Sequence, residues 1–148
     1  MDKALSDQII SIIDDVDDMT IATMRPDGFP QATTVSYMND GLDIYFMTVA
    51  DGQKARNIAR NNKVSLTINR AHKDWNNIEG LSMGALAFPV SDPEEKEKIG
   101  RLLLMKFPEA AQYEPGNDID LAFFRIEPSV ISILDYKRGF GHTELVEI

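Results

Sequence analysis

The sequence predicts a mainly β fold, a small antiparallel barrel of six to seven strands with helices packed on its outside. Seven segments have the composition or alternation of strands, and the first three of them are joined by turns that contain Asp-Gly. Asp-Gly favours hairpins because glycine supplies the positive φ that tight turns need. Strands and helices do not alternate regularly, which argues against a doubly wound parallel sheet.

The expected elements follow in order along the chain. An amphipathic helix is predicted at 5–17, where Ser6 can cap the first turn and Ile9, Ile13 and Val16 form one apolar stripe. Strands are predicted at 19–24, 29–37, 42–48, 64–69, 78–90, 119–126 and 130–136. A long helix follows Asp92, an aspartate cap with proline after it, and a loop is expected at 114–118. The last strand is expected to end near Tyr136.

Length and composition restrict the class of protein. The 148 residues, of which 43% are hydrophobic, fit a single domain over 1–148. No apolar run approaches the ~20 residues of a membrane span, and the N-terminus lacks a signal-peptide pattern. The chain has no cysteine, which is compatible with the cytoplasm, and its net charge of −9 argues against a nucleic-acid binder. An anionic ligand therefore needs a local basic cluster, and the available one is Arg25, Lys54, Arg56 and Arg60.

Residues 45–66 carry the most informative pattern, a strand, a glycine-bearing turn, a short helix and another strand. If Asp51 caps the helix, Gly52, Gln53 and Lys54 occupy its first three positions. Backbone N–H groups there lack intrahelical partners, and the helix dipole favours an anion. A lysine in the first turn opposes that dipole unless a phosphate is bound. The alternative is an exposed lysine with its ammonium in water, and the spacing alone leaves both open.

Other motifs are absent. The sequence has no phosphate-binding G-x-x-x-x-G-K-[ST], no G-x-G-x-x-G after a strand, no G-x-S-x-G and no H-E-x-x-H. His72 and His142 are the only histidines, and two residues so far apart do not indicate a metal site. No acid–base pair stands out by spacing among the carboxylates. Difficult chemistry in this protein would therefore depend on a cofactor.

Three segments resemble the FMN-binding split-barrel family of the pyridoxamine 5′-phosphate oxidase type. They are R-P-D-G-x-P at 25–30, Y-F-x-T at 45–48 and G-Q-K-x-x-N-I at 52–58, and the resemblance extends over about 5–136. It implies a split β-barrel homodimer with FMN in the cleft between subunits. It also implies a flavin-dependent oxidoreductase that acts on a small molecule, with a nicotinamide as a candidate reductant. The physiological substrate stays open.

The resemblance also implies which residues hold FMN. In this family the strand at 31–37 runs beside the flavin ring, the end of the 42–48 strand lies near the ring and ribityl chain, and the following turn reaches the phosphate. A glycine-containing strand, here 79–84, approaches the cofactor as well. The implied residues are Thr33, Thr34, Val35, Ser36, Met47, Thr48, Gly52, Gln53, Lys54, Glu79, Ser82 and Met83.

Two departures from the family pattern bear on function. The phosphate turn often carries Ser-Arg-Lys, whereas this chain has Gly52, Gln53 and Lys54, which removes the bidentate fork of an arginine. The C-terminus also lacks the arginine- and histidine-rich pattern with which pyridoxamine-phosphate oxidases hold their substrate. These differences argue against pyridoxamine-phosphate oxidation as the specific reaction.

The C-terminal segment has two interpretations. Tyr136, Phe140 or His142 can reach across a dimer interface to cover the flavin, with His142 as the one candidate catalytic residue. Alternatively, Phe140 packs on the barrel and the flanking glycines only turn the chain. Trp75 can likewise be a neighbour of the ring or an ordinary anchor.

Two further functions stay open. The protein can be a flavin-binding module that stores or senses FMN without turnover, which the missing acid–base pair favours. It can also hold deazaflavin F420 or haem in the same cleft.

Overall fold

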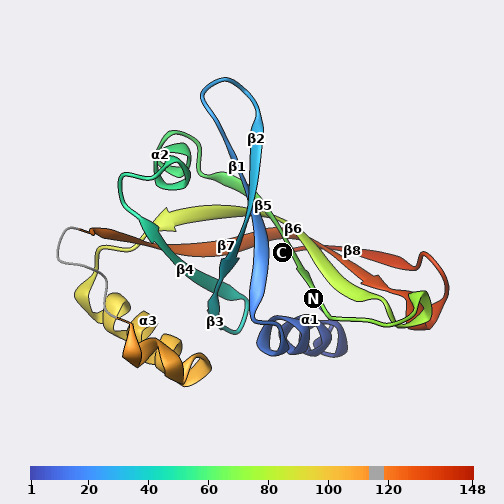
Figure 1. Ribbon diagram of the computed structural model, residues 1–148. Helices are drawn as coiled ribbons and strands as arrows, with labels where there is room; N and C mark the ends of the chain where they lie inside the picture. Colours follow the sequence, from blue (N-terminus) through green and yellow to red (C-terminus); the bar gives the residue numbers. More distant parts are fainter. Residues whose placement is uncertain (114–118) are drawn as a thin grey trace.

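In the computed structural model, which describes residues 1–113 and 119–148, an antiparallel sheet curls into a half-barrel with helices on its outside (Figure 1). The split-barrel prediction is therefore confirmed. The described strands number eight: β1 (Asp18–Met24), β2 (Pro30–Ser36), β3 (Met38–Asp40), β4 (Asp43–Val49), β5 (Lys63–Asn69), β6 (Glu79–Pro89), β7 (Leu121–Asp135) and β8 (Thr143–Glu147). The loop expected at 114–118 lies outside the described residues.

The strand order explains why the barrel is split. The sheet runs β2-β1-β5-β6-β7-β4-β3, and β8 pairs with β7 beside this path. The chain continues from β2 into β3 through Tyr37, so the two ends of the sheet meet. The ladder between β3 and β4 stops where Met38 pairs with Tyr45, because β2 turns away to pair with β1. We call the resulting gap between β2 and β4, which share no ladder among the described residues, the seam.

Strand β7 replaces two strands that the sequence predicts separately. The strands predicted at 119–126 and 130–136 are one strand of 15 residues, which pairs with β6 along nearly its whole length. A bulge absorbs the register shift, since Gly84 pairs with Val130 and Ala85 with Pro128. Proline has no N–H to donate, so it is tolerated at such a bulge. The first part of β7 also pairs with β4, and the second part pairs with β8.

The sequence predicts that the last strand ends near Tyr136, and this prediction is wrong, because the C-terminal residues form a further strand. A short turn of 3-10 helix, η3 (Tyr136–Arg138), leads into β8, which returns along β7 from Leu134 to Val130. Val146 packs partly against the barrel core, and the Ile148 N–H donates to the Ser129 carbonyl at 3.0 Å. A strand of five residues with only Leu145 and Val146 as large apolar residues gives too weak an alternation to be recognised in the sequence.

The helices begin at caps that the sequence identifies only in part. Helix α1 (Lys3–Asp15) is capped by Asp2, which accepts a bond from the Ala4 N–H, so the predicted Ser6 cap and 5–17 bounds are wrong by two residues or more. Helix α3 (Pro93–Lys106) has the predicted cap, because Asp92 accepts a bond from the Glu94 N–H. The third helix, α2 (Gln53–Arg60), belongs to the candidate site. The short turns η1 (Trp75–Asn77) and η2 (Pro108–Gln112) complete the elements.

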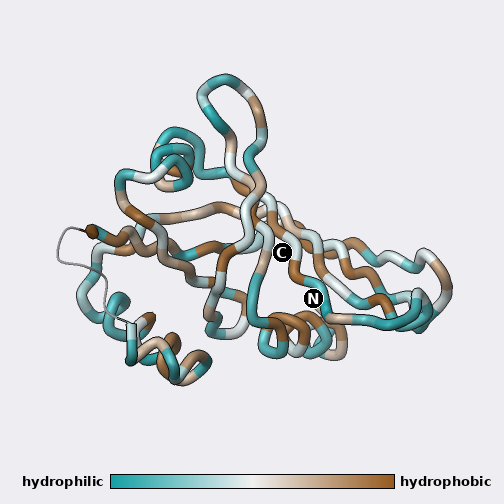
Figure 2. Tube along the Cα trace, in the orientation of Figure 1, coloured by the Kyte–Doolittle hydropathy of each residue, from teal (hydrophilic) through white to brown (hydrophobic). Residues whose placement is uncertain are grey.

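Two hydrophobic clusters lie on opposite faces of β4. The larger fills the barrel, and α1 closes it with Ile9, Ile12 and Ile13, all fully buried. The smaller lies under α3, where Ile99 packs with Tyr45 of β4. Figure 2 shows apolar residues gathered along the strands and on α1, while the tip of the β1–β2 hairpin is hydrophilic. Among the described residues, no helix is long and apolar enough to cross a membrane.

Candidate functional site

A cavity of about 260 Å³ opens at the seam, beside the start of α2. Five residues that the resemblance implied line it: Thr33, Thr48, Gly52, Gln53 and Lys54. They come from β2, β4 and α2, segments that are brought together only when the ends of the sheet meet. Thr23, Gln31 and Val49 complete the lining.

The turn before α2 differs from its prediction by one position. Gly52, not Asp51, is the N-cap, and no side chain caps the helix, so Gln53 and Lys54 are its first two residues. The Gly52 N–H donates to the Val49 carbonyl at 3.0 Å, which folds the chain sharply after β4. A Cβ at Gly52 would lie 3.1 Å from that same oxygen, so the turn fits glycine. The first N–H groups of the helix are left without intrahelical partners at the cavity wall.

Of the described residues that line this cavity, Lys54 is the one cation. Its side chain is half-buried, and burial lowers the pKa of Lys54 from its usual value of 10.5. Within residues 1–113 and 119–148, no carboxylate offsets this loss of hydration. Lys54 is therefore neither fully exposed nor fully buried, and its role as a phosphate ligand stays a prediction. An anion in the cavity would supply the missing partner.

The other three members of the predicted basic cluster are engaged elsewhere. Arg25 forms an ion pair with Asp27 at 3.2 Å in the β1–β2 hairpin. Arg60 donates to the Met24 carbonyl at 3.5 Å, and Arg56 donates to the Gln53 side chain at 3.2 Å. The cluster does not converge on one point, and Lys54 alone faces the cavity.

A buried amide network forms the floor of the cavity. Asn57, which is 1% exposed, donates to the Thr23 hydroxyl at 3.0 Å and to Gln31 at 3.3 Å, and accepts from Gln53 at 2.7 Å. Sequence analysis missed Thr23, Gln31 and Asn57. The signal was available for Thr23, because it continues the inward-facing alternation of Met19 and Ile21 as a polar residue. A polar side chain at a core position needs a partner or a function.

Thr33 adds an unpaired polar atom to the cavity. Its Oγ1 is buried and has no hydrogen-bond partner among the described residues. Buried hydroxyls without partners are uncommon, because losing water without a replacement bond is unfavourable. A ligand with donors or acceptors in this cavity would satisfy Thr33.

Two further implied residues, Ser36 and Met47, line a different cavity, which we call the apolar hollow. It has a volume of about 510 Å³ and lies between the outer face of the seam and the α3–η2 region. Ser36 and Met47 come from β2 and β4, the two strands that border the seam. Since strand side chains alternate between faces, neighbouring Met47 and Thr48 open onto different cavities.

The remaining implied residues of β2 and β6 do not reach either cavity. Thr34 and Ser82 are exposed, while Val35 and Met83 pack in the barrel core, where Met83 is 3% exposed. Their contact with a cofactor stays a prediction. The Glu79 carboxylate is engaged by other side chains of the same chain. It forms an ion pair with Arg70 at 2.6 Å and accepts a hydrogen bond from the Gln8 amide at 3.3 Å.

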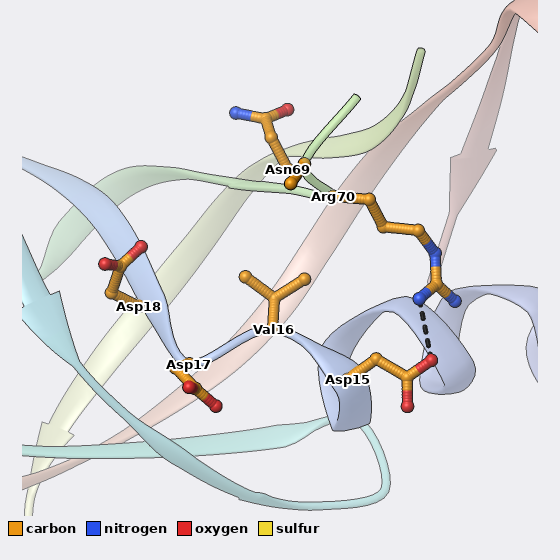
Figure 3. A pocket seen from close by; sticks show the side chains of 7 residues that line it. Asp15, Val16, Asp17, Asp18, Asn69 and Arg70 are labelled. Carbon is orange, nitrogen blue, oxygen red and sulfur yellow. Dashed lines mark hydrogen bonds and ion pairs between the residues drawn. The ribbon is translucent and has the colours of Figure 1, made fainter. Parts of the chain in front are cut away.

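Arg70 also borders a separate, acidic hollow of about 410 Å³ (Figure 3). Three carboxylates line it: Asp15, Asp17 and Asp18. Figure 3 shows Arg70 directed at Asp15, with which it pairs at 2.6 Å. Because Arg70 is already paired with carboxylates, this hollow does not suit an anionic cofactor.

The C-terminal candidates lie together but far from Lys54 in the same chain. The Phe140 ring centroid is 5.3 Å from that of Tyr136 and 5.9 Å from that of Trp75. Trp75 and Phe140 are 68% and 73% exposed, so neither is an ordinary core anchor. The Nε2 of His142 is buried without a partner among the described residues. Figure 1 shows this end of the β7–β8 hairpin at the opposite end of the molecule from α2.

No group of three or more metal-binding side chains is found in the described part of the chain.

The comparisons with known proteins point to one family and one fold. A sequence profile of the pyridoxamine 5′-phosphate oxidase family matches residues 5–135. No curated protein matches the chain in sequence. The structure is similar to that of a conserved hypothetical protein, Rv2991, from Mycobacterium tuberculosis, with a TM-score of 0.78 and 25% identity over 97% of this chain and 91% of that one.

Two other solved structures share the fold. One is a protein from Listeria innocua described as a candidate pyridoxamine 5′-phosphate oxidase (TM-score 0.71, 24% identity, 88% of this chain and 98% of that one). The other is a haem-binding protein from Mycobacterium smegmatis (TM-score 0.77, 17% identity). The similarity covers 99% of this chain and 58% of that one.

Proposed function

Since the chain belongs to the pyridoxamine 5′-phosphate oxidase family, we propose that it binds FMN non-covalently and acts as a flavin-dependent oxidoreductase. The observation that carries the proposal is the half-buried Lys54 ammonium in the seam cavity, where burial lowers its pKa and no carboxylate of the described residues compensates. A phosphate group at this point turns an unfavourable charge into a favourable one.

The cavity fits a phosphate in three respects. It has a cation in Lys54, backbone N–H groups at the start of α2, and the hydroxyls of Thr33 and Thr48. Helix starts bind phosphate because their free N–H groups and the helix dipole favour an anion. The amide network beneath holds Gln53 in place through Asn57.

The residues of this chain would then bind, orient and shield the cofactor. FMN, when bound, supplies hydride transfer chemistry that no side chain here can perform. Ser36 and Met47 border the other cavity at the seam and are the residues suited to contact the edge of the flavin ring. No acid–base pair converges there within the described residues, so the chain's contribution would be positioning and exclusion of water.

We further propose a homodimer in which the exposed aromatic cluster of one subunit covers the flavin of the other. Phe140 packs in a tilted arrangement against both Trp75 and Tyr136, and Trp75 and Phe140 expose most of their surface. Large exposed aromatic groups mark interaction surfaces. The distance of this cluster from Lys54 within one chain supports a contribution across subunits rather than within one.

The decisive experiment is reconstitution. The purified protein is stripped of small molecules and titrated in parallel with FMN, riboflavin, F420 and haemin, while absorbance and flavin fluorescence are followed. Tight binding of FMN, weaker binding of riboflavin and no binding of haemin are expected. Preferential binding of haemin would favour the haem-binding alternative, which the similarity to the M. smegmatis protein supports.

A second measurement separates an oxidoreductase from a storage or sensing module. The FMN-loaded protein is mixed anaerobically with NADH or NADPH, and the flavin absorbance is followed. Rapid bleaching is expected of an oxidoreductase that uses a nicotinamide. A flavin that stays oxidised with these and with other small reductants would favour the non-catalytic module.

A further inference from the structure

The apolar hollow differs in chemistry from the Lys54 cavity on the other side of β4. Its walls come from Met47 and Leu121 on the sheet, Leu103 and Phe107 on the α3 side, and Ala110 on η2. Its floor continues into the smaller hydrophobic cluster, of which Met47, Leu103 and Phe107 form the partly buried edge. A cavity of about 510 Å³ with mainly apolar walls and a few polar groups is typical of a small-molecule site.

Among the described residues that line the hollow, the polar groups are few and none is positively charged. They are the Ser36 hydroxyl, the Tyr113 phenol and the Glu109 carboxylate, which is the one charged side chain among its described lining residues. Lys106, at the end of α3, does not line the hollow, although its Nζ lies 5.5 Å from the ring centroid of Phe107. This Nζ is engaged by two backbone carbonyls, since it donates to Val16 at 2.8 Å and to Tyr37 at 3.0 Å. A phosphate in the hollow would lose water without gaining a cationic partner, which is unfavourable.

Helix α3 is fixed at both ends, so the hollow is a built feature of the fold. Near its N-terminus, Glu95 accepts two bonds from the Arg125 guanidinium of β7, at 2.7 and 2.9 Å. At its C-terminus, Lys106 ties the helix to the end of α1 and to Tyr37 after β2. These contacts hold the α3 wall against β4 and β7 independently of any ligand.

We propose that the apolar hollow is a binding site for an uncharged apolar ring compound and serves as the substrate site of the flavoprotein. The ligand class rests on the hollow itself, whereas its role as substrate site rests on the proposed function. Ser36 and Met47 link the hollow to the proposed flavin site. They line the hollow, and they belong to β2 and β4, the strands that also supply Thr33 and Thr48 to the Lys54 cavity. A phosphorylated substrate is disfavoured by Glu109 and by the net charge of −9.

The first test uses two probes with the same ring. 1-Naphthol and 1-naphthyl phosphate are titrated into the full-length protein by calorimetry, once with FMN bound and once without it. We expect naphthol to bind in both states and naphthyl phosphate to bind at least tenfold more weakly with FMN bound. Equal affinities for the two probes in the FMN-bound protein would overturn the proposed ligand class.

The second test places binding in the hollow with a matched pair of substitutions. Ala110→Trp fills the hollow, whereas Ala111→Trp adds the same side chain at the next, exposed position, which does not line it. Naphthol affinity should fall at least tenfold in the first variant and stay unchanged in the second. Unchanged binding in both variants would overturn the location.

A charge reversal tests the proposal without altering the packing of the wall. Glu109→Lys puts a cation at the rim, and naphthyl phosphate should then bind the FMN-loaded protein several-fold more tightly while naphthol is little affected. An unchanged preference would count against the proposed selectivity. The outcomes also separate the two proposals: a protein that takes up FMN but not naphthol refutes only the substrate site. One that binds naphthol but not FMN supports the ligand class and refutes the flavin function.

Discussion

Thr33 and Thr48 lie on strands near opposite ends of the strand order, and both line the cavity beside Lys54. They lie close together because the chain changes its pairing partner between β2 and β3: β2 pairs with β1, whereas β3 pairs with β4. The candidate site is thus a product of sheet closure, and no single segment contains it.

Lys54→Ala should weaken FMN binding by about 1.5–3 kcal/mol, the scale of a hydrogen bond to a charged group. Riboflavin, which has no phosphate, should bind the variant and the original protein about equally. Fluorescence titration with both ligands measures the difference. An equal loss for the two ligands would mean that the substitution damages the fold instead of the phosphate contact.

FMN affinity should fall at alkaline pH, beginning below 10.5, because burial lowers the pKa of Lys54. As pH rises through that lowered pKa, the free protein loses the charge that the phosphate needs. The folding stability of the ligand-free protein changes in the opposite direction and rises with pH. Between the folded and unfolded pKa values the unfolded chain holds more protons, so Lys54 becomes less destabilising as pH rises.

The control for this pH dependence is Lys54→Arg, since arginine stays charged throughout the range. The variant should bind FMN with little change up to pH 10, after correction with riboflavin for ionisation of the ring itself. If the original protein and the variant lose FMN affinity in parallel, Lys54 does not control the pH dependence.

Asn57→Ala should lower the free energy of unfolding by about 2–3 kcal/mol, because it leaves the Thr23 hydroxyl buried without its partner. Urea denaturation at neutral pH measures this loss. Gln31→Ala removes only the longer contact at 3.3 Å and should cost less. Similar losses in the two variants would show that Asn57 is not the centre of the network.

Phe140→Ala should leave the stability of the subunit nearly unchanged, since the ring is 73% exposed. If the aromatic cluster covers the flavin of a partner subunit, the variant should show higher flavin fluorescence and FMN binding weaker by about 0.5–1.5 kcal/mol. Unaltered fluorescence and affinity would leave Phe140 without a role at the flavin.

Deletion of 138–148 is a poorer test of the same idea. The deletion also removes β8 and the core contact of Val146, so the truncated protein should unfold at lower urea concentration than Phe140→Ala. A truncation as stable as Phe140→Ala would show that β8 contributes little to the fold.

The sequence predicts most of the fold because its local signals agree with the final structure. The Asp-Gly turns and the Asp92 cap each act over a few residues, and each corresponds to what is observed. Strand β4 does not alternate between buried and exposed residues, because α3 covers its outer face and Ile44, Tyr45 and Phe46 are all buried. The errors occur where pairing partners are distant. β7 is continuous because β6 supports it across the bulge at Pro128, and β8 forms because β7 offers it an edge.

The candidate site could likewise be predicted only where its residues are close in sequence. The 52–54 turn could be predicted because its glycine, the start of the helix and Lys54 lie in one short segment. Thr23, Gln31 and Asn57 are separated by up to 34 residues and are joined only by the network around the Asn57 amide. The separation of Ser36 and Met47 from Thr48 into a second cavity depends on where α3 packs, which no local pattern specifies.

The seam also determines what a ligand must displace on entry. Elsewhere in the sheet, a molecule that wedges two strands apart must break a ladder of backbone hydrogen bonds. Between β2 and β4 no such ladder is present among the described residues, so only side-chain contacts are lost. Amides on the open edge of β2 should therefore exchange with deuterium without global unfolding, and a bound ligand should slow that exchange. Access to the interior of this barrel is thus provided by its strand connectivity and does not require a moving lid.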